Sequence, residues 1–376
     1  MKIYRYLGDK LRANLGKKKI LIVYGARQVG KTTLVKNFLS GAGSVYYNCD
    51  QDETRMLFEE ANLEKLSLLV NRYDTVVIDE AQKAKNIGLA LKILFDNFPN
   101  KQYIVTGSSS FDLANSLSEP LTGRFFSYTM FPVAELELAK DKNPIALKES
   151  LETRLIYGSY PEVITAPDIE TKKAIIKNIT ANYLFKDILT SGVIKNPDLL
   201  KKLLQAIALQ AGNEVSQTEL ARLLDIDKNS VKKYLEICEK LYILFSLPPY
   251  FSNKRKAISK LKKYYFYDLG VRNSLINNFN LLETRNDVGL LWENYLVVER
   301  LKFNSSRNFD PNYYFFRSYG QQEIDWLEDE GGKINGFEFK FGAGPVGRGA
   351  KSLFYQEIKG EQLAVISQDN YQSFIL

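Results

Sequence analysis

The feature that most constrains the fold is a glycine-rich loop near the start of the chain. Residues 25–32 (GARQVGKT) match the pattern G-x-x-x-x-G-K-[ST] at every position, between the apolar run 20–24 and the amphipathic segment 33–39. In this context backbone N–H groups surround phosphates, while Lys31 reaches the β- and γ-phosphates and Thr32 ligates Mg²⁺. The sequence therefore predicts an α/β domain with a parallel sheet that binds ATP and Mg²⁺. The expected nucleotide-binding residues are Gly25, Ala26, Arg27, Gln28, Val29, Gly30, Lys31, Thr32 and Thr33.

A second apolar run, 75–78 (TVVI), leads directly into Asp79 and Glu80. At the end of such a strand Asp79 can hold Mg²⁺ through water, and Glu80 can orient and deprotonate the attacking water. This pair favours ATP hydrolysis over kinase chemistry. The alternative is a solvated acidic turn with no catalytic role.

Two weaker signals follow the next strands. The run 103–106 (YIVT) is followed by Gly107 and Ser108, which places a hydroxyl where a γ-phosphate sensor would lie, although serines in this position are usually turn residues. Arg124 precedes another apolar run and is interpreted either as a catalytic finger that reaches a neighbouring subunit or as a surface ion pair. The first interpretation of Arg124 implies a homo-oligomer.

Composition removes several classes of chemistry. The 376 residues include no histidine and only two cysteines, Cys49 and Cys238. This excludes catalytic triads and dyads that contain His, zinc sites with His ligands, and zinc sites with four Cys ligands. Any catalysis must therefore use carboxylates, lysines and oxygen-ligated Mg²⁺ or Mn²⁺. We expect both cysteines to be buried in a cytoplasmic protein. No apolar stretch reaches the roughly 18 residues of a membrane span, so we expect no membrane partner.

The middle of the chain predicts a winged helix-turn-helix. Ser216 and Glu219 form a capping box, Asp227 can cap the helix that follows, and the segments 243–247 and 264–268 can form the strands of a wing. Residues 228–263 hold ten lysines and arginines against two glutamates, a net charge of +8, while the whole chain carries +7. This charge predicts DNA contact, and the alternative is a packing module with a solvated basic face. The expected DNA-binding residues are Lys228, Lys232, Lys233, Lys254, Arg255 and Lys256.

The C-terminal part predicts a helix followed by a β-meander. The segment 287–303 is interpreted as an amphipathic helix that contains Glu293, and a hairpin turning at Gly331–Gly332 brings Asp325 towards Glu338 and Lys340. Glu338 and Lys340 share one face because strand side chains alternate. Two carboxylates and an ammonium can bind Mg²⁺ and activate water for phosphodiester cleavage without His. The alternative is a hairpin with a solvated charged face.

At several positions the sequence resembles the AAA-type ATPases of archaea and bacteria that carry a C-terminal DUF4143 domain. The matching segments are 25–33, 76–82, 104–110, 121–126 and 157–162 (YGSYPE), with Ser159 where that family more often has Gly. This resemblance implies an AAA-like ATPase module joined to a DNA-related module.

The spacing Asp-x₁₂-Glu-x-Lys is also similar to that of PD-(D/E)xK nucleases, whose fold is of the restriction-endonuclease type. The resemblance implies that Asp325 and Glu338 ligate metal, that Lys340 positions water or stabilises charge, and that Glu293 is the helical acid. Degenerate members of that group keep the fold as a binding module.

These observations predict four segments and two alternative functions. The expected segments are an AAA-like P-loop ATPase domain (1–165), a helical connector (166–205), a winged-helix domain (206–270) and a nuclease-like domain (271–376). In the first hypothesis, ATP binding and hydrolysis control DNA binding, and the last domain cleaves DNA with a metal. In the second, an ATP-driven switch binds DNA or a protein partner through a catalytically inert nuclease-like domain.

Overall fold

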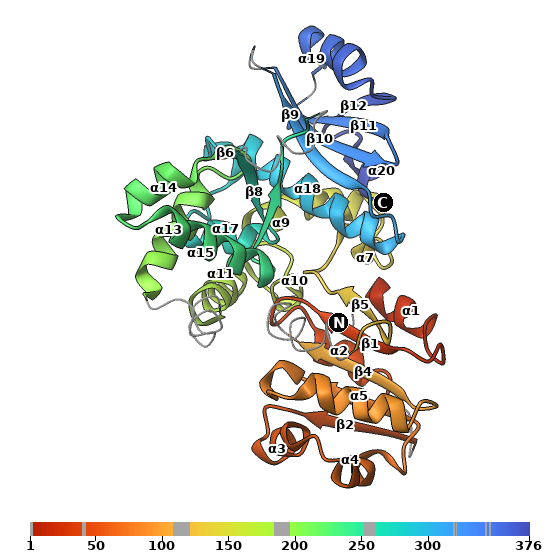
Figure 1. Ribbon diagram of the computed structural model, residues 1–376. Coiled ribbons are helices and arrows are strands. Elements are labelled where there is room, and N and C mark those ends of the chain that lie inside the picture. Colours follow the sequence, from red (N-terminus) through yellow and green to blue (C-terminus); the bar gives the residue numbers. More distant parts are fainter. Residues whose placement is uncertain are drawn as a thin grey trace. The chain divides into compact units, whose positions relative to one another are not determined.

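The computed structural model describes residues 3–39, 43–107, 121–183, 196–251, 261–318, 320, 322–342, 344–345 and 347–376 (Figure 1). The chain forms two compact units. The N-terminal unit contains Ile3–Pro132 and Lys240–Tyr242, and the C-terminal unit contains Val133–Glu239 and Ile243–Leu376. The predicted module boundaries at 165, 205 and 270 all fall inside the C-terminal unit and stay predictions.

The N-terminal unit is built on a five-stranded parallel sheet in the order β2-β3-β4-β1-β5. All five residues of β1 are buried, as expected for an apolar strand in a parallel sheet. The strands are β1 (Ile20–Tyr24), β2 (Ser44–Asn48), β3 (Thr75–Asp79), β4 (Gln102–Gly107) and β5 (Phe125–Thr129). The helices are α1 (Tyr6–Arg12), α2 (Lys31–Lys36), α3 (Asp52–Glu60), α4 (Leu63–Val70), the 3₁₀ turn η2 (Ala81–Lys83) and α5 (Ile87–Asn97).

The register of this sheet places the ends of three strands side by side. Tyr24 at the end of β1 pairs with Gly107 of β4, and Ile78 of β3 pairs with Val105 of the same strand. The glycine-rich loop, Asp79 and Thr106 therefore meet at one edge of the sheet. This arrangement confirms the predicted α/β fold with a parallel sheet.

The first half of the C-terminal unit is helical and leads into a three-stranded antiparallel sheet, β6-β8-β7. The first helices are α7 (Glu135–Leu138), α8 (Pro144–Glu149), α9 (Leu151–Tyr157), α10 (Pro161–Thr165), α11 (Ile169–Asn178) and the π-helix η3 (Ile179–Tyr183). The elements after them are α13 (Pro197–Leu209), β6 (Glu214–Val215), α14 (Gln217–Leu224), α15 (Lys228–Lys240), β7 (Leu244–Leu247), β8 (Lys262–Phe266) and α17 (Leu269–Leu275).

The two helices α14 and α15 are delimited by the residues that the sequence indicated. The hydroxyl of Ser216 accepts a hydrogen bond from Glu219 N at 3.2 Å, and Asp227 Oδ1 accepts one from Ser230 N at 3.0 Å. Between the helices Asp225 adopts a left-handed conformation, with φ of 53°. The turn therefore spans residues 225–227, while the assignment of the whole segment as a winged helix stays a prediction.

The last part of the chain forms a mixed four-stranded sheet in the order β12-β11-β10-β9. Its elements are the 3₁₀ turn η4 (Leu282–Thr284), α18 (Val288–Ser306), β9 (Asn312–Arg317), β10 (Glu323–Glu330), β11 (Lys333–Phe339), α19 (Arg348–Leu353), the π-helix η5 (Phe354–Ile358), β12 (Gln362–Ile366) and α20 (Tyr371–Ile375). β10 and β11 form the expected hairpin, with Trp326 opposite Phe337. Trp292, Trp326 and Phe315 lie in the core beside this sheet.

Helix α18 corrects one sequence interpretation. The segment was expected to be amphipathic, but twelve of its 19 residues are buried, including Asn294, Glu299, Lys302 and Asn304. A helix that packs on most of its circumference has no solvated stripe. Its polar side chains therefore need partners inside the protein.

Both cysteines are buried, as expected. Among the residues that the structure describes, we find no helix long and apolar enough to span a membrane.

Candidate functional sites

The glycine-rich loop connects β1 to α2 and depends on its first glycine. Gly25 has a φ of 150°, and a Cβ at this position would lie 2.3 Å from the carbonyl oxygen of Met130. Gly30 begins α2 with a φ of 98°. The ammonium of Lys31, only 4% exposed, donates hydrogen bonds to the carbonyl oxygens of Gly25 (2.9 Å) and Ala26 (2.8 Å). The loop thus holds a buried positive charge at the N-terminus of a helix, where phosphates bind.

Asp79, at the end of β3, is the acceptor at the centre of this site. Its carboxylate receives hydrogen bonds from the hydroxyls of Thr32 (2.7 Å), Tyr46 (2.6 Å) and Thr106. Burial, together with the hydrogen bond to Asp79, raises the pKa of Tyr46, so this hydroxyl remains a donor. The sequence predicted the roles of Asp79 and Thr32 but gave no role to Tyr46 or Thr106.

The side chains of Thr32 and Asp79 fit Mg²⁺. Their oxygen atoms already lie within hydrogen-bond distance, and hydroxyl, carboxylate and water oxygens are the ligands that Mg²⁺ prefers. Glu80, the next residue, has a left-handed backbone with φ of 52° and accepts a hydrogen bond from Gln82 Nε2 at 2.6 Å. Non-glycine residues in this conformation are uncommon and concentrate at functional sites.

Arg124 forms an ion pair on the surface of its own unit. Its Nε lies 3.0 Å from Asp96 Oδ1, a second guanidinium nitrogen lies 3.3 Å from Asp96 Oδ2, and the side chain is 32% exposed. A role on the γ-phosphate of a neighbouring copy stays a prediction. The predicted sensor Ser108 lies outside the described residues.

A second candidate site is a pocket of about 430 Å³ in the C-terminal unit. It brings together the four residues that the sequence grouped: Glu293 of α18, Asp325 of β10, Glu338 of β11 and Lys340 just after it. Since Trp326 pairs with Phe337, Asp325 lies beside Glu338 on the neighbouring strand. The catalytic and metal-binding roles of these residues stay predictions.

The carboxylates of this pocket differ in their partners. Glu338 Oε1 lies 2.7 Å from Lys340 Nζ, whereas the buried Glu338 Oε2 accepts no hydrogen bond from the described residues. Asp325 Oδ2 accepts one from Phe339 N at 2.7 Å. Burial, and secondarily the charge of Glu293, raises the pKa of Asp325 to about 7, against the opposing charge of Lys263. Asp325 and one oxygen of Glu338 therefore remain for a ligand.

These two carboxylates fit a hard divalent cation that keeps most of its water. The described residues contain no cluster of three or more acidic or thiol side chains arranged to hold a metal. Mg²⁺ is commonly bound through one or two carboxylates, with water and substrate phosphates completing its coordination. The unsatisfied Glu338 Oε2 matches this pattern because a cation would satisfy it.

Sequence reasoning missed the residues that β8 contributes to this pocket. Lys263 Nζ lies 3.0 Å from Glu293 Oε1 and also pairs with Glu323, and the Tyr265 hydroxyl donates to Glu293 Oε1 at 2.6 Å. Lys263 had been counted in the basic stretch 228–263, but only 2% of the residue is exposed. The one available signal was a lysine followed by a run of aromatic residues in a buried strand.

The predicted DNA-binding residues of α15 are on the surface. Lys228, Lys232 and Lys233 are all exposed, and Lys232 lies 3.9 Å from Glu236 of the same helix. Lys254, Arg255 and Lys256 lie outside the described residues.

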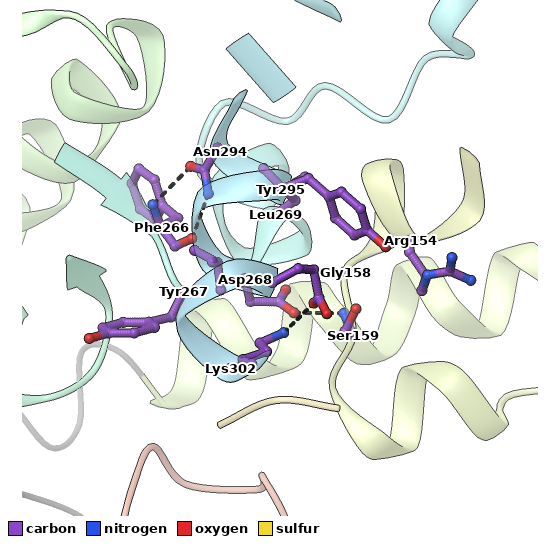
Figure 2. A pocket seen from close by; sticks show the side chains of 12 residues that line it. Arg154, Gly158, Ser159, Phe266, Tyr267, Asp268, Leu269, Asn294, Tyr295 and Lys302 are labelled. Atoms are coloured by element: carbon purple, nitrogen blue, oxygen red, sulfur yellow. Dashed lines mark hydrogen bonds and ion pairs between the residues drawn. The ribbon is translucent and has the colours of Figure 1, made fainter. Parts of the chain in front are cut away.

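Gly158 and Ser159, within the segment 157–162 (YGSYPE), line a small cavity of about 10 Å³, room for roughly one water molecule (Figure 2). Gly158 has a φ of 82°, and a Cβ there would lie 2.0 Å from Asp268 Oδ1. Ser159 N donates to Asp268 Oδ2 at 2.6 Å, and Asp268 also caps α17 through Val271 N at 3.2 Å. The backbone, not the Ser159 side chain, makes these contacts, so a serine can stand in place of glycine.

Three segments of the chain match models of known protein families. Residues 17–139 match the model of an AAA domain (AAA_14), residues 148–282 match DUF8612, a domain of unknown function, and residues 288–373 match DUF4143, also a domain of unknown function. The matches to an AAA domain and to DUF4143, in this order, confirm the resemblance seen in the motifs of the chain.

Several relatives share most of the chain. An uncharacterized protein of Mycobacterium tuberculosis is 27% identical over 364 residues, covering 95% of this chain and 78% of that protein. An uncharacterized protein of Methanocaldococcus jannaschii is 26% identical over 330 residues, covering 82% of this chain and 72% of that protein. Among solved structures, a Walker-type ATPase of Pyrococcus abyssi matches with a TM-score of 0.49 and 18% identity, covering 72% of this chain and 94% of that one.

Asp268 makes the stability of the C-terminal unit depend on pH. Burial raises the pKa of Asp268 to about 6, although Lys302 and hydrogen bonds from Ser159 and Val271 oppose the shift. The folded state therefore binds more protons than the unfolded state between about pH 4 and pH 6, and stability falls as pH rises through this window. Asp268→Asn keeps a capping oxygen and should reduce that slope by up to ~1.4 kcal/mol per pH unit, as urea unfolding would show.

The matched control is Asp168→Asn at the N-cap of α11. Hydrogen bonds from Thr171 lower the pKa of this fully exposed aspartate, so its contribution to stability has the opposite sign and increases with pH. The interpretation is wrong if Asp268→Asn leaves the slope between pH 4 and pH 6 as it is in the wild type.

Proposed function

We propose that this protein is a Mg²⁺-dependent ATPase whose ATP cycle controls DNA binding, and that its C-terminal pocket cleaves DNA with Mg²⁺ or Mn²⁺. One observation carries the proposal: Asp325, Glu338 and Lys340 line one pocket with Glu293, and Glu338 Oε2 accepts no hydrogen bond there from the described residues. Carboxylates and an ammonium in this arrangement suit metal-assisted phosphodiester hydrolysis. The AAA domain match supports the ATPase part.

At the ATP site, the chain's own groups would act as follows. The loop amides and Lys31 would bind the β- and γ-phosphates, and Thr32 with Asp79 would hold Mg²⁺, which would supply positive charge beside the phosphates. Glu80, kept in place by Gln82, orients the attacking water and accepts its proton. The hydroxyls of Tyr46 and Thr106 donate to the carboxylate of Asp79 and hold it in position.

At the second site, Asp325 and Glu338 would hold the divalent cation and Lys340 would position the attacking water or stabilise charge. The cation supplies a Lewis acid and lowers the pKa of bound water. We place this site in a nuclease-like domain at 271–376, after an ATPase domain (1–165), a connector (166–205) and a winged helix (206–270).

The proposed DNA contact rests on the helix pair α14–α15 and its charge. The second helix presents Lys228, Lys232 and Lys233 to solvent, and the antiparallel strands β7 and β8 follow it, as a wing would. Such lysines neutralise phosphates and carry no sequence information.

The ATPase assignment is tested at Glu80 and Lys31. Lys31→Ala should abolish ATP hydrolysis, whereas Glu80→Gln should lower kcat about 100-fold or more while ATP still binds, because only proton transfer from water is lost. Phosphate release and fluorescent ATP binding measure the two effects. Glu64→Gln, an exposed glutamate of α4, should leave kcat unchanged. Wild-type turnover in Glu80→Gln would overturn the role of this residue.

The cleavage assignment is tested at Asp325 and Lys340. Purified protein with Mn²⁺ or Mg²⁺ should cut DNA, and Asp325→Asn or Lys340→Ala should reduce the rate about 100-fold or more, since each removes a group that acts on the reacting atoms. Lys31→Ala and Glu330→Gln, which alters an exposed residue of β10, should retain cleavage. If the wild type cuts none of single-stranded, duplex or branched DNA, the C-terminal domain is inert and the second hypothesis, an ATP-driven switch, replaces the first.

DNA contact by α15 predicts a defined salt dependence. Lys232→Gln/Lys233→Gln should weaken DNA binding and reduce the slope of log K against log[salt] by about 2, one unit for each phosphate that is no longer neutralised. Lys201→Gln/Lys202→Gln removes the same charge from exposed positions of α13 and serves as the control. Equal slopes for the two double variants in fluorescence anisotropy titrations would show that α15 does not bind phosphate.

A further inference from the structure

The carboxylate pocket contains a buried ammonium from a part of the chain outside the DUF4143 match. Lys263 lies on β8, within the segment that matches DUF8612, and reaches Glu293 of α18 and Glu323 of β10. Only 2% of its side chain is exposed, and its Nζ also lies 5.3 Å from the centre of the Phe315 ring. The charge of this lysine is therefore directed at the pocket carboxylates.

The backbone around Lys263 is fixed on both sides. In the three-stranded sheet Lys263 pairs with Glu214 of β6 and with Leu247 of β7. Two residues further on, the buried Tyr265 extends from the same face of β8 and donates to Glu293 Oε1, the oxygen that Lys263 also contacts. Glu293 is thus held by two groups of one strand and acts as a positioning residue.

The charges that line the pocket do not balance. Four carboxylates line it, Glu293, Glu323, Asp325 and Glu338, together with the two ammonium groups of Lys263 and Lys340. With all of these groups ionised the pocket carries a charge of −2, which one divalent cation would balance. Lys263 forms ion pairs with Glu293 and Glu323, and Lys340 forms an ion pair with one oxygen of Glu338. Asp325 and Glu338 Oε2 therefore remain for that cation.

We propose that the pocket binds a single divalent cation, through Asp325 and Glu338, and that the buried ammonium of Lys263 takes the electrostatic place of a second cation. Pockets with two metals hold them ~3.5–4 Å apart between shared carboxylates. Here Lys263 pairs with both Glu293 and Glu323, the carboxylates that could serve a second metal. Tyr265 also donates to Glu293, and Arg317 Nε lies 3.8 Å from Glu323 Oε2. The inference rests on the proposed metal site. It adds that Lys263 of β8, a strand outside the nuclease-like segment, determines how many divalent cations the pocket binds.

The test counts the Mn²⁺ ions that depend on Asp325. Mn²⁺ is titrated into the full chain without nucleotide, bound ions are counted by electron paramagnetic resonance and calorimetry, and the count for Asp325→Asn is subtracted. The expected count is one for the wild type, with the spectrum of an isolated ion. Lys263→Met leaves the residues that line the pocket at −3 and removes the buried ammonium from Glu293 and Glu323. Tyr265 still donates to Glu293, and Arg317 still lies 3.8 Å from Glu323 Oε2, but the uncompensated negative charge attracts a second cation. The expected count is therefore two, with the spectrum of a coupled pair.

Three further variants make the result specific. Lys263→Arg keeps the positive charge and should bind one ion, and Lys262→Met, which alters the neighbouring lysine that contacts Ser246, should also bind one. Lys263→Gln can still donate a hydrogen bond to Glu293 and replaces Lys263→Met if that variant does not fold. Its expected count is again two.

The outcomes separate this inference from the proposed function. A wild type that binds no Asp325-dependent Mn²⁺ overturns the metal site and the inference together. A wild type that binds a coupled pair, or a neutral variant at Lys263 that still binds one ion, overturns the inference alone and leaves the metal site standing.

Discussion

The C-terminal unit depends on the pairing of charges along the buried helix α18. Taking a charged side chain out of water costs several kcal/mol unless an opposite charge or hydrogen bonds compensate, so each buried polar group on this helix selects a partner. Arg300 forms two contacts of 2.8 Å with Glu328 of β10, and Asn294 bonds both N and O of Phe266 on β8. These pairs fix the helix against both sheets, and Glu293 is held at the carboxylate pocket as one of them.

The same helix also holds the first residues of the C-terminal unit. Glu299 accepts a hydrogen bond from Glu135 N at 2.7 Å, and Lys302 donates to Val133 O at 3.2 Å. On the other side of Pro132, Arg5 donates to Phe131 O and to Val29 O of the phosphate loop. Phe131 is therefore tied to the nucleotide site and Val133 to α18.

The sequence contained enough information for the parts of both sites that are local. Three features depend only on spacing along one or two neighbouring strands: the glycine loop, Asp79 at the end of its strand, and the alternation of Glu338 and Lys340. In the structure each of them lies at the position that this spacing indicated. Lys263 could not be placed in this way. Its partners lie 30 and 60 residues further along the chain, and in the sequence its charge is indistinguishable from that of the other lysines in the stretch 228–263.

Helix α18 was misread for the same reason. Glu299 and Lys302 predict a solvated face when only the helix is considered, and they are buried because they pair with each other and with the segment 133–135. Tyr46 and Thr106 were missed because a hydroxyl in a strand has many uses, and only the fold shows that both face Asp79.

Without histidine, the protein uses lysine in two physically different ways. Lys31 donates to two backbone carbonyls, which carry no net charge, so a negatively charged phosphate can take their place. Lys263 is held by two carboxylates, and breaking a buried ion pair costs ~3–5 kcal/mol. Lys31 can therefore exchange these carbonyl partners for phosphate when nucleotide binds. Lys263 is committed to its carboxylates, which makes it a permanent part of the pocket's charge balance.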